Sequence, residues 1–92
     1  MVIRSYADKH LQPFSEKGRT GGLSVQNVAR MRRMLTALKN ASQPSDMNLP
    51  GYGFHELKGQ GRGTYAVTVS GNWRLLFEWD HGAANVRLED YH

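Results

Sequence analysis

The spacing of apolar residues changes near the middle of the chain. In residues 25–41 the apolar side chains recur every three or four positions, at Val28, Met31, Leu35 and Leu38. This spacing places them on one face of a helix, and Ser24, just before it, is a good N-cap residue. The pattern predicts an amphipathic helix with its methionines in the core and its arginines and lysine off the apolar stripe.

The N-terminal part of the chain predicts two shorter elements. Residues 2–6 have the composition of a short strand. Leu11 and Phe14 then lie on one side of a helix that we expect to end at Gly18, since glycine commonly follows the last helical turn. Pro13 is tolerated in a first helical turn but not in a helix interior, so this helix is short or starts late.

From residue 54 onward apolar and polar residues alternate, and this pattern predicts a sheet. The expected strands are residues 54–59, 64–70, 73–80 and 83–92. Gly71-Asn72 is a two-residue turn of the kind that closes hairpins. The preceding stretch, residues 42–53, contains two prolines and two glycines and is expected to be a loop.

The same alternation assigns side chains to the two faces of the sheet. One face of the third expected strand carries Trp73, Leu75, Phe77 and Trp79. Arg74 lies on the other face, and a hairpin closed by Gly71-Asn72 would place it opposite Val69. In the last strand one face carries Val86, Leu88, Asp90 and His92, and Tyr91 points the other way.

The element order is therefore β-α-α-β-β-β-β, which predicts an α+β fold with two helices packed on one face of an antiparallel sheet. A chain of 92 residues is expected to form a single domain over residues 1–92. The absence of cysteine excludes disulfides, zinc–thiolate sites and thiol nucleophiles, and suits a reducing compartment. Without an apolar stretch of membrane-spanning length or a secretory signal, we expect a cytoplasmic protein with no membrane association.

Positive charge is concentrated in the first two-thirds of the chain. Residues 1–62 contain ten Lys and Arg against four Asp and Glu, whereas residues 63–92 contain two against four. This distribution suits a polyanionic partner such as RNA or DNA. A solvated basic helix face explains the same charges equally well.

The glycine-rich run at residues 51–63 does not have the context of a nucleotide-binding loop. A Walker loop or dinucleotide fingerprint opens a helix, whereas this run leads into a predicted strand. We interpret it as a loop between strands. Lys58 and Arg62 lie beside its glycines, an arrangement that suits a nucleic-acid backbone.

The ionisable residues narrow the possible chemistry. No two of the histidines have metal-ligand spacing, and the sequence has no serine nucleophile elbow. Histidine, lysine, tyrosine and arginine suffice for metal-free RNA cleavage. In that reaction a base takes the proton of the ribose 2′-OH, an acid protonates the leaving 5′ oxygen, and cations stabilise the phosphate charge.

The sequence resembles a known protein family. The stretches "IRSY", "FSEKG", "HELKGQGRGTYAVTVSGNWRLLFEW" and "EDYH" together resemble the HigB toxins, within the RelE-like group of bacterial type II toxin–antitoxin systems. The resemblance implies a RelE-like fold and a ribosome-dependent mRNA endoribonuclease, without a cofactor or metal, that cleaves at the A site of the 30S subunit and inhibits translation. It also implies a HigA-like helix-turn-helix antitoxin partner, through which operator DNA is bound only indirectly.

The resemblance assigns site residues one by one. Its catalytic positions fall on His55, Lys58, Arg74, Asp90, Tyr91 and His92, and its RNA-binding positions on Lys58, Arg62 and Arg74. The chain departs from many relatives at Gln60-Gly61, where they carry an acidic residue after the "LKG" motif.

The roles of these residues are hypotheses with open alternatives. His92 is the preferred general acid or base, because an unperturbed imidazole changes charge near neutral pH. Which of His55 and His92 is the acid stays open. Lys58 and Arg74 would stabilise the phosphate charge. Asp90 either takes part in the site or forms a salt bridge with an arginine, Arg87 or Arg74, at the end of its strand.

Two other functions compete with RNA cleavage. A non-catalytic protein of the same fold could bind RNA or an antitoxin, although the "DYH" triad, residues 90–92, favours cleavage because a binding protein has no need of it. A basic DNA-binding module is disfavoured, because no recognition helix follows the arginine-containing helix.

Overall fold

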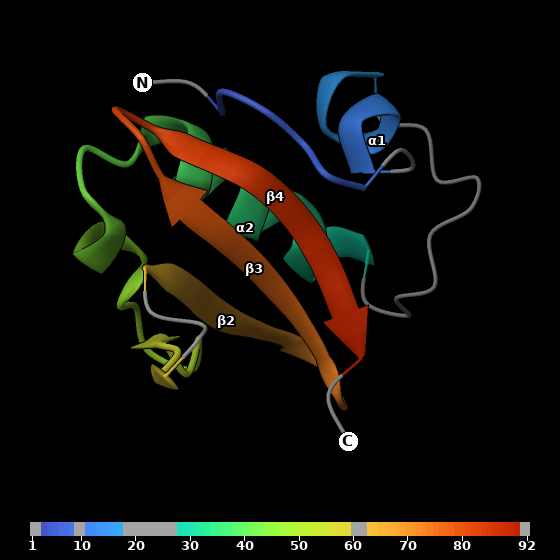
Figure 1. Cartoon of the computed structure of the whole chain (residues 1–92). Helices are drawn as coiled ribbons and strands as arrows, with labels where there is room; N and C mark the ends of the chain where they lie inside the picture. The colour runs from blue at the N-terminus through green and yellow to red at the C-terminus, as the bar shows by residue number, and fades with distance from the viewer. Residues whose placement is uncertain (1–2, 9–10, 18–27, 60–62, 91–92) are drawn as a thin grey trace.

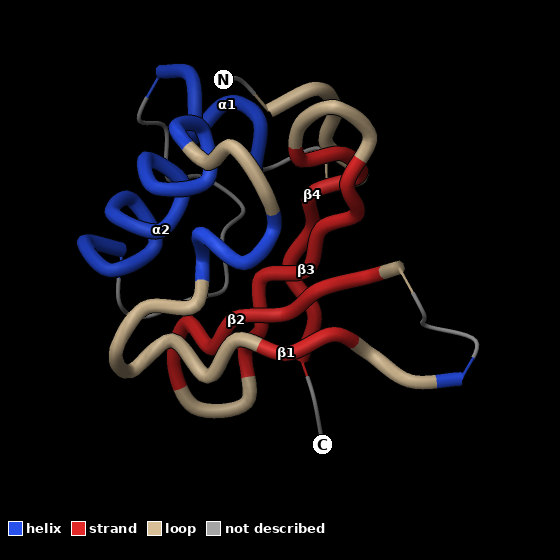
Figure 2. The backbone as a smooth tube through the Cα atoms, turned by 90° about the vertical axis from the view of Figure 1, so that its left-hand side faces the viewer, coloured by secondary structure: helices blue, strands red, loops and turns tan. Residues whose placement is uncertain are grey.

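A computed structural model describes residues 3–8, 11–17, 28–59 and 63–90. Its helices are α1 (Leu11–Lys17), α2 (Val28–Asn40) and the short 3₁₀ helix η1 (Pro44–Met47), and its strands are β1 (His55–Glu56), β2 (Thr64–Ser70), β3 (Trp73–Trp79) and β4 (Ala83–Asp90). The strands form an antiparallel sheet in the order β1-β2-β3-β4 (Figure 1). Figure 2 shows the helices and the strands as two layers. The predicted α+β architecture is confirmed.

The core lies between these two layers. The helices contribute Leu11, Phe14, Met31, Met34, Leu35 and Leu38, and the strands contribute Val67, Val69, Leu75, Phe77, Ala83 and Val86. Both methionines of α2 have no exposed surface, so their assignment to the core is confirmed. Each side chain of this size contributes about 1.5–3 kcal/mol when fully buried, so this apolar contact fixes the helices on the sheet.

The helix predictions hold where the structure describes the chain. In α1 the buried residues are Leu11 and Phe14, and Pro13 lies in the first turn, as its missing N–H requires. In α2 the predicted stripe faces the core. Ser24 and Gly18, the expected cap residues, lie outside the described residues.

The prediction of a strand at residues 2–6 is wrong for the described residues 3–6, which do not form a regular strand. The chain near Ser5 runs beside β4, but within the described residues 3–8 only one parallel bridge, between Tyr6 and Val86, is formed. The Val86 N–H donates to the Ser5 carbonyl at 3.1 Å, and the Arg4 N–H donates to the Ala83 carbonyl at 2.7 Å. The bulge of β4 lies between these two contacts.

The Tyr6 side chain ties this segment to α1. Its hydroxyl donates to Ser15 Oγ at 2.6 Å. Burial is the largest influence on the pKa of Tyr6 and raises it. The hydrogen bond to Ser15 lowers this pKa, and the Glu16 carboxylate raises it by a smaller amount. The hydroxyl therefore remains a donor at neutral pH.

Residues 42–53 are more ordered than the predicted loop. They include η1, in which a proline takes up the first position and Met47 is fully buried. The Asp46 carboxylate accepts the Ser42 N–H at 2.8 Å and holds the turn. Proline suits a first helical position because its missing N–H would have no partner there.

The first strand of the sheet, β1, is shorter than predicted. It covers only His55 and Glu56, because Gly53 before it and Gly59 after it have positive φ angles of 60° and 66°. These angles lie outside the β region, and glycine adopts them without steric cost. One further hydrogen bond, from the Leu57 N–H to the Thr64 carbonyl at 2.8 Å, extends the pairing toward the glycine loop.

The β2–β3 hairpin closes on Gly71-Asn72 as predicted, with Ser70 opposite Trp73. The predicted partner of Arg74 is wrong, because it lies opposite Thr68 and not Val69. A bulge at Val69 adds one residue to β2 next to the turn, and the count from the turn is therefore off by one. The faces of β3 are as predicted, with Leu75 and Phe77 fully buried against the helices.

Part of the basic face of α2 is structural. The Arg30 guanidinium donates to the Thr68 carbonyl at 3.1 Å and the Gly51 carbonyl at 2.6 Å, and lies 5.3 Å from the centre of the Tyr52 ring. Lys39 Nζ donates to the Ser15 carbonyl at 2.8 Å. These cations join α2 to β2 and to α1, a use that the charge pattern alone did not reveal. Within the described part of the chain, no helix is long and apolar enough to span a membrane.

Candidate active site on the outer face of the sheet

The sheet has one face against the helices and an outer face turned away from them. Cross-strand pairing sets His55, Ala66, Leu76 and Arg87 in one row, and Thr68, Arg74 and Glu89 in a second row. Residues paired directly across strands share a face. His55 and Arg74 therefore both lie on the outer face, in adjacent rows.

His55 is exposed at the edge strand β1. Its Nδ1 lies 2.9 Å from the Gly53 carbonyl oxygen. When Nδ1 carries the proton, it donates to this carbonyl, and Nε2 is then a proton acceptor directed elsewhere. This contact orients the ring in a way that a general base requires.

Lys58 is exposed and lines a groove of about 430 Å³ together with Glu56, Leu57 and Gly59. Across the glycine loop, Glu56 Oε2 accepts the N–H of Gly63 at 2.9 Å, which fixes the start of β2 against β1. The run is thus not a loop throughout, because β1 lies within it, and its described residues 57–59 and 63 lie between β1 and β2. Gln60, Gly61 and Arg62 lie outside the described residues.

Arg74 is half-buried at the hairpin end of the sheet. Its Nη1 donates to the Gly71 carbonyl at 3.1 Å and to the Trp73 carbonyl at 3.4 Å. These bonds hold the guanidinium near its own turn. A planar guanidinium is the type of cation that binds a phosphate in a bidentate manner.

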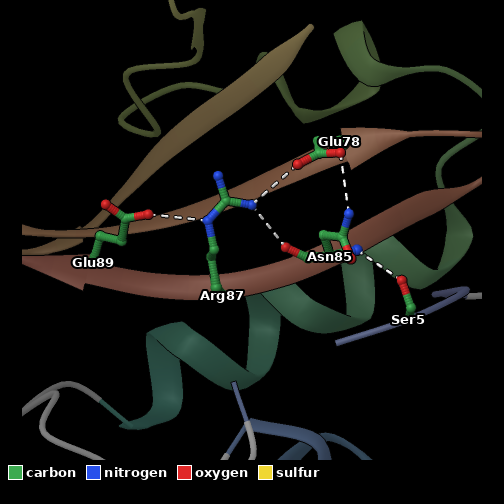
Figure 3. Close-up of polar contacts among 5 residues, drawn as sticks. All are labelled: Ser5, Glu78, Asn85, Arg87 and Glu89. Atoms are coloured by element: carbon green, nitrogen blue, oxygen red, sulfur yellow. Dashed lines mark hydrogen bonds and ion pairs between the residues drawn. The ribbon is translucent and has the colours of Figure 1, made fainter. Parts of the chain in front are cut away.

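A polar network lies over β3 and the edge strand β4 (Figure 3). Arg87 forms ion pairs with Glu89 at 3.0 Å and with Glu78 at 3.5 Å, and its Nη1 donates to the Asn85 carbonyl at 3.0 Å. Asn85 Nδ2 donates to Glu78 at 3.1 Å, and the Asn85 N–H donates to Ser5 Oγ at 2.8 Å. Sequence patterns alone do not reveal this network, although Arg87 and Glu89 share a strand face.

Asp90 ends β4 and is exposed. Its cross-strand partner is Trp73, which packs against the core, so the Asp90 position belongs to the helix-facing side of the sheet. The alternative of a salt bridge from Asp90 to Arg87 is wrong, because Arg87 pairs with Glu78 and Glu89 on the outer face. Arg74 has Glu89 opposite it.

The predicted site residues do not converge on one point. His55 and Arg74 are two strands apart, which is roughly 10 Å across the sheet. Leu57 bonds to Thr64, whose row reaches β4 at Ala84, so the Lys58 region and Asp90 lie about 20 Å apart along the sheet. Tyr91 and His92 lie outside the described residues, as does Arg62. The described part of the site is therefore extended, with cations at two separate positions.

The remaining histidine in the described part, His81, is a turn residue with a φ angle of 58° and a side chain that is 91% exposed. It is therefore a surface residue. Among the described residues no group of three or more His, Asp or Glu is placed to hold a metal ion.

Comparison with known proteins relates the chain to bacterial toxins. Residues 4–92 match a family described as the RelE-like toxin of the type II toxin–antitoxin system HigB. The chain is 37% identical to Endoribonuclease HigB of Proteus vulgaris over 92 residues, covering 99% of this chain and 100% of that protein. It is 32% identical to Toxin HigB-1 of Vibrio cholerae serotype O1 over 91 residues, covering 95% of this chain and 94% of that protein.

Proposed function

Since the chain belongs to the HigB-like family of RelE-like toxins from type II toxin–antitoxin systems, we propose that it is an endoribonuclease that cleaves mRNA on the ribosome. The family inferred from the sequence motifs is confirmed. The observation that carries the proposal is the end-to-end similarity to a protein named Endoribonuclease HigB. The exposed positions of His55 and Lys58 support it, because both are open to a large substrate.

The proposed reaction is an internal transesterification of RNA. A base removes the proton of a ribose 2′-OH, the 2′ oxygen forms a bond to the adjacent phosphorus, and the bond to the 5′ oxygen breaks. An acid gives a proton to that leaving oxygen, so the products are a 2′,3′-cyclic phosphate and a 5′-hydroxyl. His92 and His55 are the candidates for acid and base, and Asp90 and Tyr91 complete the proposed site.

The two cations have separate tasks in this proposal. Arg74 stabilises the negative charge that develops on the phosphate, and Lys58, with Arg62, holds the RNA backbone or the same phosphate. The extended arrangement of the described residues supports a polymeric substrate, because a single strand of RNA can contact positions that a small molecule would not span.

The toxin is paired with an antitoxin, as HigB toxins of type II systems are. We propose that this partner is a HigA-like helix-turn-helix protein and that any binding to operator DNA runs through it. A non-catalytic role, in which the toxin binds RNA or the antitoxin without cleavage, is the alternative. The cleavage assays below separate the two.

Cleavage should depend on the ribosome. The stacked rings of Phe54, Tyr65 and Phe77 belong to or pack against the core and are therefore not an open platform for bases. We therefore expect the ribosome to present the message in an in-line geometry, which is a large part of the barrier reduction in such reactions. Purified toxin is mixed with naked mRNA or with the same mRNA on programmed ribosomes, and the new 5′ ends are mapped. Equal cleavage of the two substrates would contradict ribosome dependence, and cleavage of neither would favour the binding role.

Cleavage should also be independent of a metal bound to the toxin. The proposed acid, base and cations supply every proton and charge that the reaction needs. Toxin treated with a chelator and then desalted is added to ribosomes kept intact in magnesium, and its rate should equal that of untreated toxin. A loss of activity that a transition metal restores would contradict this mechanism.

A further inference from the structure

The β4 strand contains one extra residue, and this residue determines where the end of the strand lies. Between the pairs Leu76–Arg87 and Glu78–Ala84, β3 advances by two residues and β4 by three. Asn85 has a φ angle of 51°, in the left-handed region, which locates the bulge at this residue. Such bulges re-aim the side chains that follow them.

The burial pattern confirms the change of face. Ala83 and Val86 both have no exposed surface and both belong to the core, although they are three residues apart. Regular alternation from Ala83 would instead turn Arg87 toward the core and Asp90 to the outer face. The bulge therefore decides on which side of the sheet Asp90 lies.

The bulge is held from three directions (Figure 3). The Asn85 N–H donates to Ser5 Oγ, its Nδ2 donates to Glu78, and its carbonyl accepts a hydrogen bond from Arg87. Asparagine is also one of the few residue types other than glycine that enters the left-handed region readily. The sequence thus combines a suitable residue with partners on β3, on β4 and in the N-terminal segment.

We propose that Asn85 is a positioning residue for RNA cleavage: its left-handed backbone conformation sets the register of β4 from Val86 to Asp90, and so places Glu89 opposite the proposed site residue Arg74 on the outer face. This inference rests on the proposed function for its catalytic part. Its structural part concerns the register of β4 and can be measured without cleavage. Asn85 itself is four residues before Glu89 and acts through the strand.

The test compares two substitutions at one position. Asn85→Gly keeps the left-handed backbone and the main-chain bonds, and loses only the side-chain bond to Glu78. Asn85→Val disfavours a positive φ, because its branched side chain crowds the backbone there. The glycine variant should keep most of the wild-type single-turnover rate on ribosomes. The valine variant should lose about 10²-fold, the scale of a small misplacement of a reacting group, with KM nearly unchanged.

Two controls make the outcome specific. Met47→Ala removes a buried side chain in η1 and should lower the melting temperature while the folded protein cleaves at its normal rate. Amide and α-proton NMR contacts between Leu75 and Leu88, which are paired in the structure, should persist in Asn85→Gly and be lost in Asn85→Val. If the valine variant does not fold, Asn85→Ala is used instead, because alanine strains the backbone less at a positive φ angle.

The inference is overturned if the valine variant keeps its cleavage rate, or if the glycine and valine variants lose it equally. The second result would trace the effect to the side-chain bond with Glu78 and not to the backbone. A wild-type protein that does not cleave would contradict the proposed function alone. The register would then be judged by the NMR contacts, whose persistence in Asn85→Val would overturn the structural part.

Discussion

Replacing His92 with alanine should lower cleavage on ribosomes by about 10²–10⁴-fold, the usual contribution of a general acid or base. The melting temperature should hardly change. Val86, fully buried, and Leu88, packed against the core, hold β4 in place six and four residues before this position, so the strand should stay attached when residue 92 is changed. The measurements are single-turnover cleavage and thermal unfolding of the same preparation.

A matched control removes a histidine that has no proposed role. His81 lies in an exposed turn, and His81→Asn keeps a residue type that accepts its positive φ angle. This variant should cleave at the wild-type rate. Unchanged cleavage in His92→Ala would assign the proton transfer to His55 and Lys58, and an equal loss in both variants would indicate a nonspecific effect of removing an imidazole.

Arg74→Ala should lower cleavage by about 10²–10³-fold, the scale for the loss of one group that stabilises transition-state charge. The fold should survive, because Arg74 is on the outer face, whereas the core is formed by the other face of β3. Arg74→Lys keeps the charge but loses the planar pair of donors, so its rate should lie between those of the alanine variant and the wild type. Single-turnover rates and circular dichroism are compared for all three proteins.

The control for this second prediction is Arg33→Ala, which removes the same charge from the exposed side of α2. It should leave cleavage within the range expected for a small change in net charge. An Arg74→Ala protein that unfolds would assign the arginine a structural role at the hairpin. A loss of equal size in Arg33→Ala would attribute the effect to overall charge.

Much of the fold follows from the period of the apolar residues. The stripe of α2 and the alternation in β2 and β3 were predicted because burial on one face repeats at a fixed spacing. The cross-strand partner of Arg74 was predicted wrongly, because the bulge at Val69 adds a residue that alternation cannot reveal. The bulge at Asn85 also depends on the N-terminal segment through Ser5, a contact between residues 80 positions apart.

The site residues were predicted from family motifs and not from the period of the apolar residues. The family motifs supplied the identities of His55, Lys58, Arg74 and Asp90, because local residue patterns are what motifs record. They did not supply the spacing of these residues across the sheet or the ion pairs of Arg87, which depend on strand register and on side chains from separate strands. The roles of all the proposed site residues remain predictions.

The contacts of Arg30 have a consequence for how this basic protein interacts with polyanions. The affinity of a protein for RNA falls with salt in proportion to the number of phosphates that its cations neutralise, because each neutralised phosphate releases condensed counterions. The Arg30 guanidinium is directed at the Gly51 and Thr68 carbonyls, and Lys39 at that of Ser15. These cations contribute to the pI of 9.8 but are committed to the protein's own backbone. The number of cations that can contact RNA phosphates directly is therefore smaller than the number of lysines and arginines in the chain.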